Sequence, residues 1–221
     1  MWFVPHFDSA GTGEKEMSMK KTAAILSVML GMVLIASPGF AQLRGGGFLL
    51  AASYYIPVEE GISNGYGSTI GFVLPVRNRV QLALEWKYGR HSVTKQENGF
   101  LTGRLNITPL LLSIRYSFAD QVTVVPYVFG GLGWFFASFN ADERQSIDEL
   151  TVVKQDPKGG LGLYGGMGLN YRASPSLAIY AEALYLYRDT KVETVYLLGP
   201  SETFSANLSS LSLQIGIRYF Y

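Results

Sequence analysis

Seven charged side chains alternate with large apolar residues along this sequence and are its best candidates for chemistry. They are Glu85, Lys87, Arg104, Arg115, Arg172, Glu182 and Arg218. If they face one narrow interior they have to pair, because an unpaired buried charge is strongly disfavoured. Two interpretations follow: a gated path for ions, and a packed plug of ion pairs that only stabilises the fold.

Two further motifs look chemical but lack the context that their chemistry requires. His91 and Ser92 are adjacent, and neighbouring residues of a strand point to opposite faces, so they cannot act together as base and nucleophile. The stretch "GLGLYG", Gly160 to Gly165, matches a dinucleotide fingerprint, but no helix follows it to hold a pyrophosphate. Glycines there are better explained as room for long side chains of neighbouring strands.

An acidic segment, residues 140–158, raises the question of a metal. It carries Asp142, Glu143, Asp148, Glu149 and Asp156, whose spacing matches no calcium-binding loop. Solvated charge on an exposed loop is the simpler interpretation. We therefore predict no metal, no cofactor and no catalytic residue.

The composition is too apolar for an ordinary soluble protein. Charged residues make up 16% of the 221 residues, against about 25% in soluble domains. The formal net charge is +1, which gives no basic field for nucleic acid. The chain has no Cys, which is compatible with an oxidising compartment.

The N-terminal region is expected to be processed. Residues 19–41 form a secretory signal, with Lys20 and Lys21 before an apolar run and cleavage between Ala41 and Gln42. The apolar run is shorter than the roughly 20 residues that a membrane-spanning helix needs. Residues 1–18 are interpreted as a mis-assigned extension before the true start, and residues 42–221 as one domain.

Period-two alternation, interrupted by turn residues, predicts eight strands in that domain. They lie near 45–56, 66–75, 79–95, 101–118, 122–139, 159–172, 177–193 and 205–221. Short turns alternate with longer connections, which include 140–158 and 194–204. In the fourth strand the polar phase shifts at Thr108-Pro109, and this predicts a β-bulge. The fifth strand carries Phe and Gly in both phases, and the pattern leaves its orientation open.

A membrane barrel explains this alternation better than a soluble sandwich or a soluble barrel. Aromatic residues gather near the strand ends of the apolar face, for example Trp86, Tyr116 and Tyr171, as in interfacial girdles. Lipid offers the backbone no hydrogen-bond partners, so the sheet has to close on itself. The predicted fold class is all-β: a single eight-stranded antiparallel up-and-down transmembrane β-barrel. A strand needs about 9–11 residues to cross a membrane, and several of the predicted strands are longer than that.

The last strand predicts how the barrel closes. Tyr219 and Tyr221 end an alternating apolar face, and that strand is expected to pair with the first. A terminal aromatic on such a strand resembles the signal read by the outer-membrane assembly machinery. Both ends of the domain and the short turns then lie on the periplasmic side, and the longer connections lie outside.

Two stretches carry a family resemblance: "VPYVFGGLGWFF" (Val125–Phe136) and "GLGLYGGMGLNYRASPSLAIYAEALYLY" (Gly160–Tyr187). They resemble the OmpA-like family of eight-stranded outer-membrane barrels, in which Glu182 would be the acidic lumen residue. No peptidoglycan-binding domain follows, so the layout is more similar to OmpX-type and opacity members of the porin family. The resemblance implies roles in envelope integrity, adhesion or host-surface interaction.

The leading functional hypothesis is a monomeric outer-membrane protein of a Gram-negative bacterium with a structural or adhesion-like surface role and no catalysis. A narrow channel or carrier for small solutes is the alternative, and a lipid A-modifying enzyme with His91 is the third. The expected partners are outer-membrane lipid and lipopolysaccharide, the assembly machinery, and a host or cell-surface ligand.

Overall fold

The computed structural model describes residues 46–94, 101–119, 123–142, 145–147, 150–197 and 200–221, and their regular structure is entirely β-strand. The predicted signal segment 19–41, its cleavage point at Ala41 and Gln42, and residues 1–18 lie outside the described residues. Residues 44–221 form one compact unit. Among the described residues, no helix is long and apolar enough to cross a membrane.

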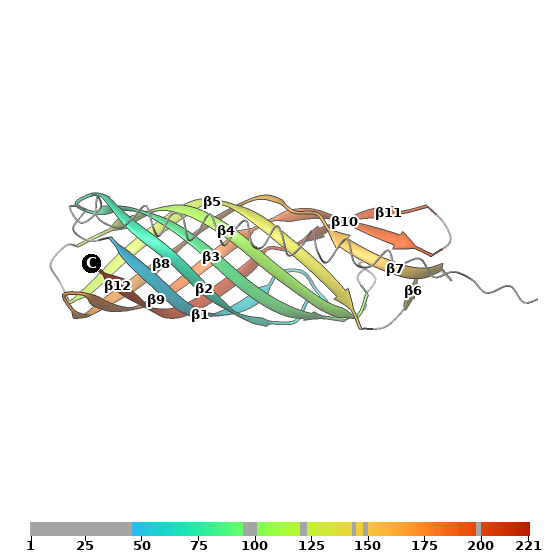
Figure 1. Ribbon diagram of the computed structural model, residues 1–221, viewed down its shortest axis with the longest axis horizontal. Coiled ribbons are helices and arrows are strands. Elements are labelled where there is room, and N and C mark those ends of the chain that lie inside the picture. The colour runs from blue at the N-terminus through green and yellow to red at the C-terminus, as the bar shows by residue number, and fades with distance from the viewer. Residues whose placement is uncertain (1–45, 95–100, 120–122, 143–144, 148–149, 198–199) are drawn as a thin grey trace, which may run out of the picture. The chain divides into compact units, whose positions relative to one another are not determined.

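Eight strands close into an antiparallel barrel in the order β1-β12-β9-β8-β5-β4-β3-β2 (Figure 1). They are β1 (Gly47–Pro57), β2 (Gly65–Arg77), β3 (Val80–Val93), β4 (Gly103–Ser117), β5 (Val124–Ala141), β8 (Gly160–Ser174), β9 (Leu177–Tyr187) and β12 (Ser210–Phe220). The first and last strands pair without a break from Gly47↔Phe220 to Pro57↔Ser210. The predicted eight-stranded antiparallel barrel is therefore confirmed.

The two ends of the barrel differ in their connections. At one end β2 and β3, β4 and β5, and β8 and β9 are joined by short turns, and Gly47 and Phe220 meet there. We call this the short-turn end, and the opposite end, with the longer connections, the long-loop end. Several strands exceed the roughly 9–11 residues that cross a membrane, and β5 has 18 residues. The barrel wall therefore continues beyond the membrane at the long-loop end.

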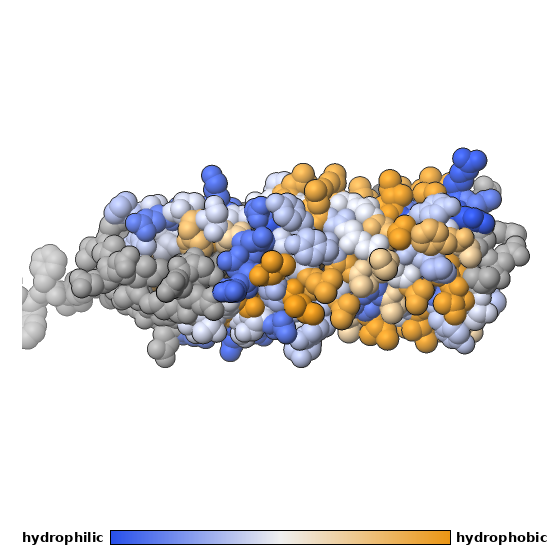
Figure 2. Space-filling view, turned by 180° about the vertical axis from the view of Figure 1, so that it is seen from behind, coloured by the Kyte–Doolittle hydropathy of each residue, from blue (hydrophilic) through white to orange (hydrophobic). Residues whose placement is uncertain are grey.

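The outer surface is apolar over the half of the barrel near the short-turn end. Leu112, Ile114, Leu163 and Ile215 are exposed there, and Figure 2 shows apolar side chains gathered over part of the barrel's length. Aromatic pairs flank this zone: Tyr116 with Phe118 and Phe48 with Tyr221 near the short-turn end, and Tyr54 with Tyr66 on the other side. Such a zone between aromatic girdles is typical of a lipid-facing barrel surface.

The fourth strand corrects one prediction. Its pairing with β5 runs continuously through Thr108↔Phe136 and Pro109↔Phe135, so the predicted bulge is absent. Arg104 therefore shares the outward phase of Leu112 and is exposed on the barrel's outside. The change from polar to apolar residues reflects a change in what surrounds the wall: near Thr108 the outer face passes from water to lipid.

A second sheet is formed partly by connections that the sequence pattern assigned to loops and partly by the ends of the predicted strands 177–193 and 205–221. It has the order β11-β10-β7-β6, formed by β6 (Gln145–Ile147), β7 (Leu150–Pro157), β10 (Asp189–Tyr196) and β11 (Glu202–Asn207). The predicted loop 140–158 therefore contains β6 and β7, and the two ends of the predicted loop 194–204 belong to β10 and β11. β10 and β11 continue from β9 and β12, so this sheet extends the barrel at the long-loop end (Figure 1).

An apolar cluster lies under this extension, and we call it the outer core. Its buried members are Ile62, Val93, Leu101, Leu105, Phe139, Val152, Val192, Tyr196, Ala206 and Leu208. In contrast, the outside of the same wall carries exposed Arg90, Ser92 and Arg104. Here the polarity is that of a water-soluble protein, with an apolar interior and a polar surface.

Candidate functional site

The charged residues of the barrel interior form one connected group, the interior charge cluster. Arg115, on β4, lies between two carboxylates: its Nη1 donates to Glu182 Oε1 on β9 and its Nη2 donates to Glu85 Oε1 on β3. Lys87 Nζ lies 3.1 Å from Glu85 Oε2. Because β4 and β9 are not neighbours in the sheet, the Arg115–Glu182 pair connects separate parts of the wall through the lumen.

Polar side chains that the sequence analysis did not select complete the cluster. Gln214 Nε2 donates to Glu182 Oε2, and Lys87 Nζ donates to Gln214 Oε1 at 2.6 Å. Tyr127 OH donates to Glu182 Oε1 at 2.5 Å. Gln214 alternates with Arg218 on the polar face of the last strand, and that signal could have identified it. Tyr127 was hidden because the fifth strand had no clear phase; the structure turns it inward.

The seven predicted lumen residues separate into three groups. Glu85, Lys87, Arg115, Glu182 and Arg218 are buried and lie close together. Arg172 is exposed and lines a cavity at the short-turn end. Arg104 is exposed on the outer face of β4, and the prediction that it lies in the lumen is wrong for the reason given by the continuous β4 register.

An apolar and aromatic group packs against the charge cluster, where Phe129 lies opposite Arg115, and continues toward the outer core. This apolar plug consists of Tyr55, Leu111, Tyr127, Phe129, Phe135, Tyr164, Leu184 and Leu186. Along β4 the buried inward residues change from Arg115 through Leu111 to Leu105 as the strand leaves the short-turn end. An eight-stranded barrel is just wide enough for side chains to fill it, and these side chains do so.

Glycines of β8 give the plug and the cluster their space. A Cβ on Gly168 would lie 2.6 Å from the Tyr127 ring, and one on Gly162 would lie 2.6 Å from Phe135. Both distances are too short for real side chains. The predicted role of the "GLGLYG" region as space for long side chains agrees with this geometry.

Arg188, at the end of β9, is a further buried cation that sequence analysis missed. Its guanidinium donates to the carbonyl oxygens of Gly160 and Lys158, and it lies 5.4 Å from the centre of the Phe135 ring. It therefore joins β8 and β9 where the barrel passes into the second sheet. A lone Arg between Tyr187 and Asp189 gives no sequence signal of this bridging position.

His91 and Ser92, the two adjacent residues considered as base and nucleophile, lie on opposite sides of the barrel wall. His91 is buried, with Nδ1 3.2 Å from Ser63 O and its ring against Tyr55, whereas Ser92 is exposed on the outer face. In the described part of the chain, no group of three His, Cys, Asp or Glu side chains could hold a metal ion.

Comparisons with known proteins agree with the architecture. No family model matches the chain, and no curated protein matches its sequence. Solved structures with a similar fold include the outer membrane protein OprG from Pseudomonas aeruginosa, at 14% identity over 80% of this chain and 97% of that one, with a TM-score of 0.60. Neisserial surface protein A is 19% identical over 80% and 97% of the two chains, with a TM-score of 0.57. Outer membrane protein AlkL is 17% identical over 84% and 93%, with a TM-score of 0.53.

The closed sheet, the apolar outer zone and the buried charges define the class: a small eight-stranded barrel of the outer-membrane type. The similarity to OprG, NspA and AlkL, at these identities, is one of fold, and it agrees with the resemblance found in the sequence.

Proposed function

We propose that this chain is an integral outer-membrane protein that interacts with other surfaces through its second sheet and performs no catalysis. In this placement the short-turn end faces the periplasm and the second sheet faces the exterior. The observation that carries the proposal is the open edge of β11, held above the membrane by a barrel whose interior is filled.

The filled interior favours a surface role over transport. Buried charges around Arg115 pair across the lumen, and the apolar plug occupies the next layer. A narrow channel remains the alternative, and single-channel recording of the purified protein in a planar bilayer tests it. We expect closed bilayers for the wild type and for Glu182→Ala; steady conductance steps in the wild type would favour the channel.

The edge of β11 has donors that point away from its own sheet. Leu208 N donates to Arg188 O, toward the β9–β10 side, whereas Asn207 N donates to Glu59 Oε2 on the opposite side. Backbone N–H groups alternate in direction along an antiparallel strand. Ser205, two residues before Asn207, therefore directs its N–H to the open edge, where the described residues contain no further strand.

An open edge of this kind can take up an extended segment of another protein by β-augmentation, because the partner's backbone supplies the missing hydrogen bonds. The partner that fits is an exposed strand or extended peptide of a host or cell-surface protein. The remaining expected partners belong to the same proposal: lipid and lipopolysaccharide around the barrel, and an assembly machinery that reads Tyr219 and Tyr221.

The test is a single substitution on the edge strand with a matched control. Ser205→Pro removes the outward N–H and leaves the inward donors that pair with β10, whereas Ser205→Ala keeps the N–H and removes only the hydroxyl. We measure adherence of bacteria displaying each variant to cultured cells and to extracellular matrix, with heat-modifiability on a gel as the check of barrel folding. Adherence lost in Ser205→Pro and kept in Ser205→Ala supports the proposal. Equal adherence of folded Ser205→Pro and wild type contradicts it.

An enzyme acting on lipid A is the third hypothesis, and the separation of His91 from Ser92 weighs against it. Mass spectra of lipid A from cells with and without the protein test this directly. We expect identical spectra; a deacylated product that disappears in His91→Gln would replace the surface role with catalysis.

A further inference from the structure

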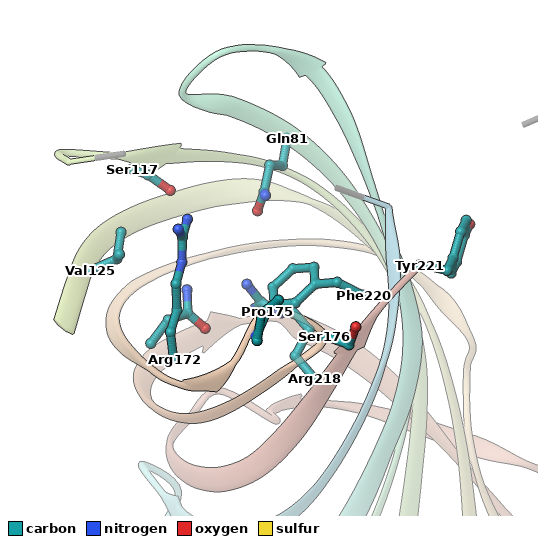
Figure 3. A pocket seen from close by; sticks show the side chains of 10 residues that line it. Gln81, Ser117, Val125, Arg172, Pro175, Ser176, Arg218, Phe220 and Tyr221 are labelled. Carbon is teal, nitrogen blue, oxygen red and sulfur yellow. The ribbon is translucent and has the colours of Figure 1, made fainter. Parts of the chain in front are cut away.

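A cavity of about 430 Å³ opens at the short-turn end of the barrel, next to the interior charge cluster. Its polar lining consists of Gln81, Ser117, Asn170, Arg172, Ser176 and Arg218. Figure 3 shows Arg172, Arg218 and Gln81 extending into this mouth from different parts of the wall. Tyr221 completes the lining; none of the described side chains there is acidic, and two of them are guanidinium groups.

The buried charges behind the cavity do not balance these cations. Within the interior charge cluster, Lys87, Arg115 and Arg218 face only two carboxylates, those of Glu85 and Glu182. Both carboxylates are shared: Glu85 pairs with Arg115 and Lys87, and Glu182 pairs with Arg115 and, at the longer distance of 3.8 Å, with Arg218. An excess positive charge in a low-dielectric interior requires an anionic partner.

Arg218 is the cation without a hydrogen-bonded partner. Its side chain is 1% exposed, and its Nε and Nη2 atoms have no hydrogen-bond partner. The nearest carboxylate oxygen, Glu182 Oε1, is 3.8 Å from Nη2 and already accepts from Arg115 and Tyr127. Nε and Nη2 have almost no accessible surface, and the guanidinium lies 5.5 and 5.1 Å from the centres of the Tyr127 and Tyr180 rings. Other atoms of the Arg218 side chain therefore border the cavity.

We propose that this cavity binds a small organic anion, carrying carboxylate or phosphate groups, from the aqueous compartment at the short-turn end. Arg172 at the mouth pairs with one anionic group, and the positive charge of Arg218 in the inner wall attracts a second. Val125, Pro175 and Phe220 supply apolar contact for the carbon skeleton. The volume is within the range of about 300–1,000 Å³ that is common for small-molecule sites.

The site is a closed pocket and does not require a channel. Leu184 and Leu186 of the apolar plug lie farther from the short-turn end than Glu182, so an anion that enters from that end meets Arg218 and stops there. Binding at this mouth is independent of the edge of β11 at the other end of the barrel. Loss of one activity therefore leaves the other open to measurement.

The experiment is a titration of the full chain, folded in phosphate-free detergent micelles, with succinate and separately with inorganic phosphate. Isothermal calorimetry is expected to give saturable binding that weakens as NaCl is added, because the contacts are ionic. Arg172→Gln should raise the dissociation constant at least about tenfold, which is the loss of affinity expected when a hydrogen bond to a charged group is removed. Arg172 is exposed, so this variant should fold as the wild type does.

The matched control is Arg77→Gln, which removes the same charge from an exposed position at the same end but outside the cavity. It should change the dissociation constant less than twofold. The proposal is overturned if neither anion saturates the wild type at millimolar concentration, or if Arg77→Gln and Arg172→Gln lose equal affinity.

Discussion

The barrel wall has two regions with opposite polarity. Near the short-turn end, Leu112 and Ile114 of β4 face outward while Arg115 faces inward, paired with Glu85 and Glu182. Near the long-loop end of the same strand, Arg104 faces outward while Leu105 is fully buried in the outer core. One continuous strand thus holds a charged interior in one region and an apolar interior in the other.

The difference shows that the surrounding solvent decides which side of a strand is apolar. Lipid solvates the Leu and Ile side chains of the first region, so its interior is left for ion pairs. Water surrounds the second region, so its apolar side chains are driven inside. The backbone register does not change between them, since β4 and β5 pair without interruption from Gly103↔Ala141 to Ser117↔Tyr127.

The largest effect is expected from breaking the interior charge cluster. Arg115→Leu leaves Glu85 and Glu182 without their shared cation, and losing one partner of a buried pair costs about 3–5 kcal/mol. Urea unfolding of the refolded protein in lipid vesicles measures the change. The matched control is Ile114→Leu on the lipid-facing side, which should change the free energy of unfolding by less than about 1.5 kcal/mol. Equal stability of the two variants would contradict the role of the cluster.

A charge placed on the outer face of β4 locates the boundary between the lipid-facing region and the water-facing region. Leu112→Arg puts a guanidinium against lipid and should destabilise the barrel by about 2–4 kcal/mol. Asn106→Arg, six residues earlier on the same face and beside the natural Arg104, should change stability little. The same vesicle-based unfolding measures both variants. A large cost for Asn106→Arg would mean that lipid extends to that level.

Truncating the outer core should affect only the long-loop region. Leu105→Ala removes a fully buried side chain, and we expect a local loss of about 2 kcal/mol, the low end for such truncations. Hydrogen exchange should become faster in β7 and β10 while barrel amides near Arg115 stay protected. Uniformly faster exchange along the whole barrel would show that the two regions unfold as one unit.

The smallest effect concerns an ion pair on the exposed surface of the second sheet. Lys158 Nζ lies 2.5 Å from Glu193 Oε2, and this hydrogen bond lowers the pKa of the Glu193 carboxyl and raises that of Lys158. Glu193 also lies opposite Asp156 in the β7–β10 pair, so Lys158 separates two like charges. Screening by water makes the contribution to stability slight.

The sign of that effect follows from the lowered pKa of Glu193. Its stabilisation is present above the ordinary pKa of a glutamate and is lost as the pH falls through the lowered value. Hydrogen exchange in β10 should therefore show a small extra weakening in acid, and Glu193→Gln should remove this pH dependence. An unchanged acid response in Glu193→Gln would assign it to other groups.

The regular part of the barrel could be read from the sequence because lipid-facing and lumen-facing residues alternate locally. The pairing of Gly47 with Phe220 follows once eight such strands have to close. The second sheet could not be predicted in this way. β7 pairs with β10 across a long stretch of chain, as in Glu193↔Asp156, and its partners are not visible in a local pattern.

The candidate site was likewise predicted in part. Alternation selects Glu85, Glu182 and Arg218, but it assumes that the apolar face of a strand points out of the barrel along the strand's whole length. That assumption placed Arg104 in the lumen, since the outer face of β4 turns polar where it enters water. It also could not show which cations share a carboxylate, because the pairing of Arg115 with two glutamates depends on three strands at once.

The most direct test of the account is a spin-label scan along the outward residues of β4 in lipid bilayers. The chain has no Cys, so single cysteines at positions 104, 106, 108, 110, 112, 114 and 116 can be labelled one at a time. We predict that labels at 110–114 are accessible to oxygen and shielded from a water-soluble nickel chelate, and that labels at 104 and 106 show the reverse. Nickel accessibility along the whole series, or oxygen accessibility at positions 104 and 106, would contradict a wall whose polarity inverts where it leaves the membrane.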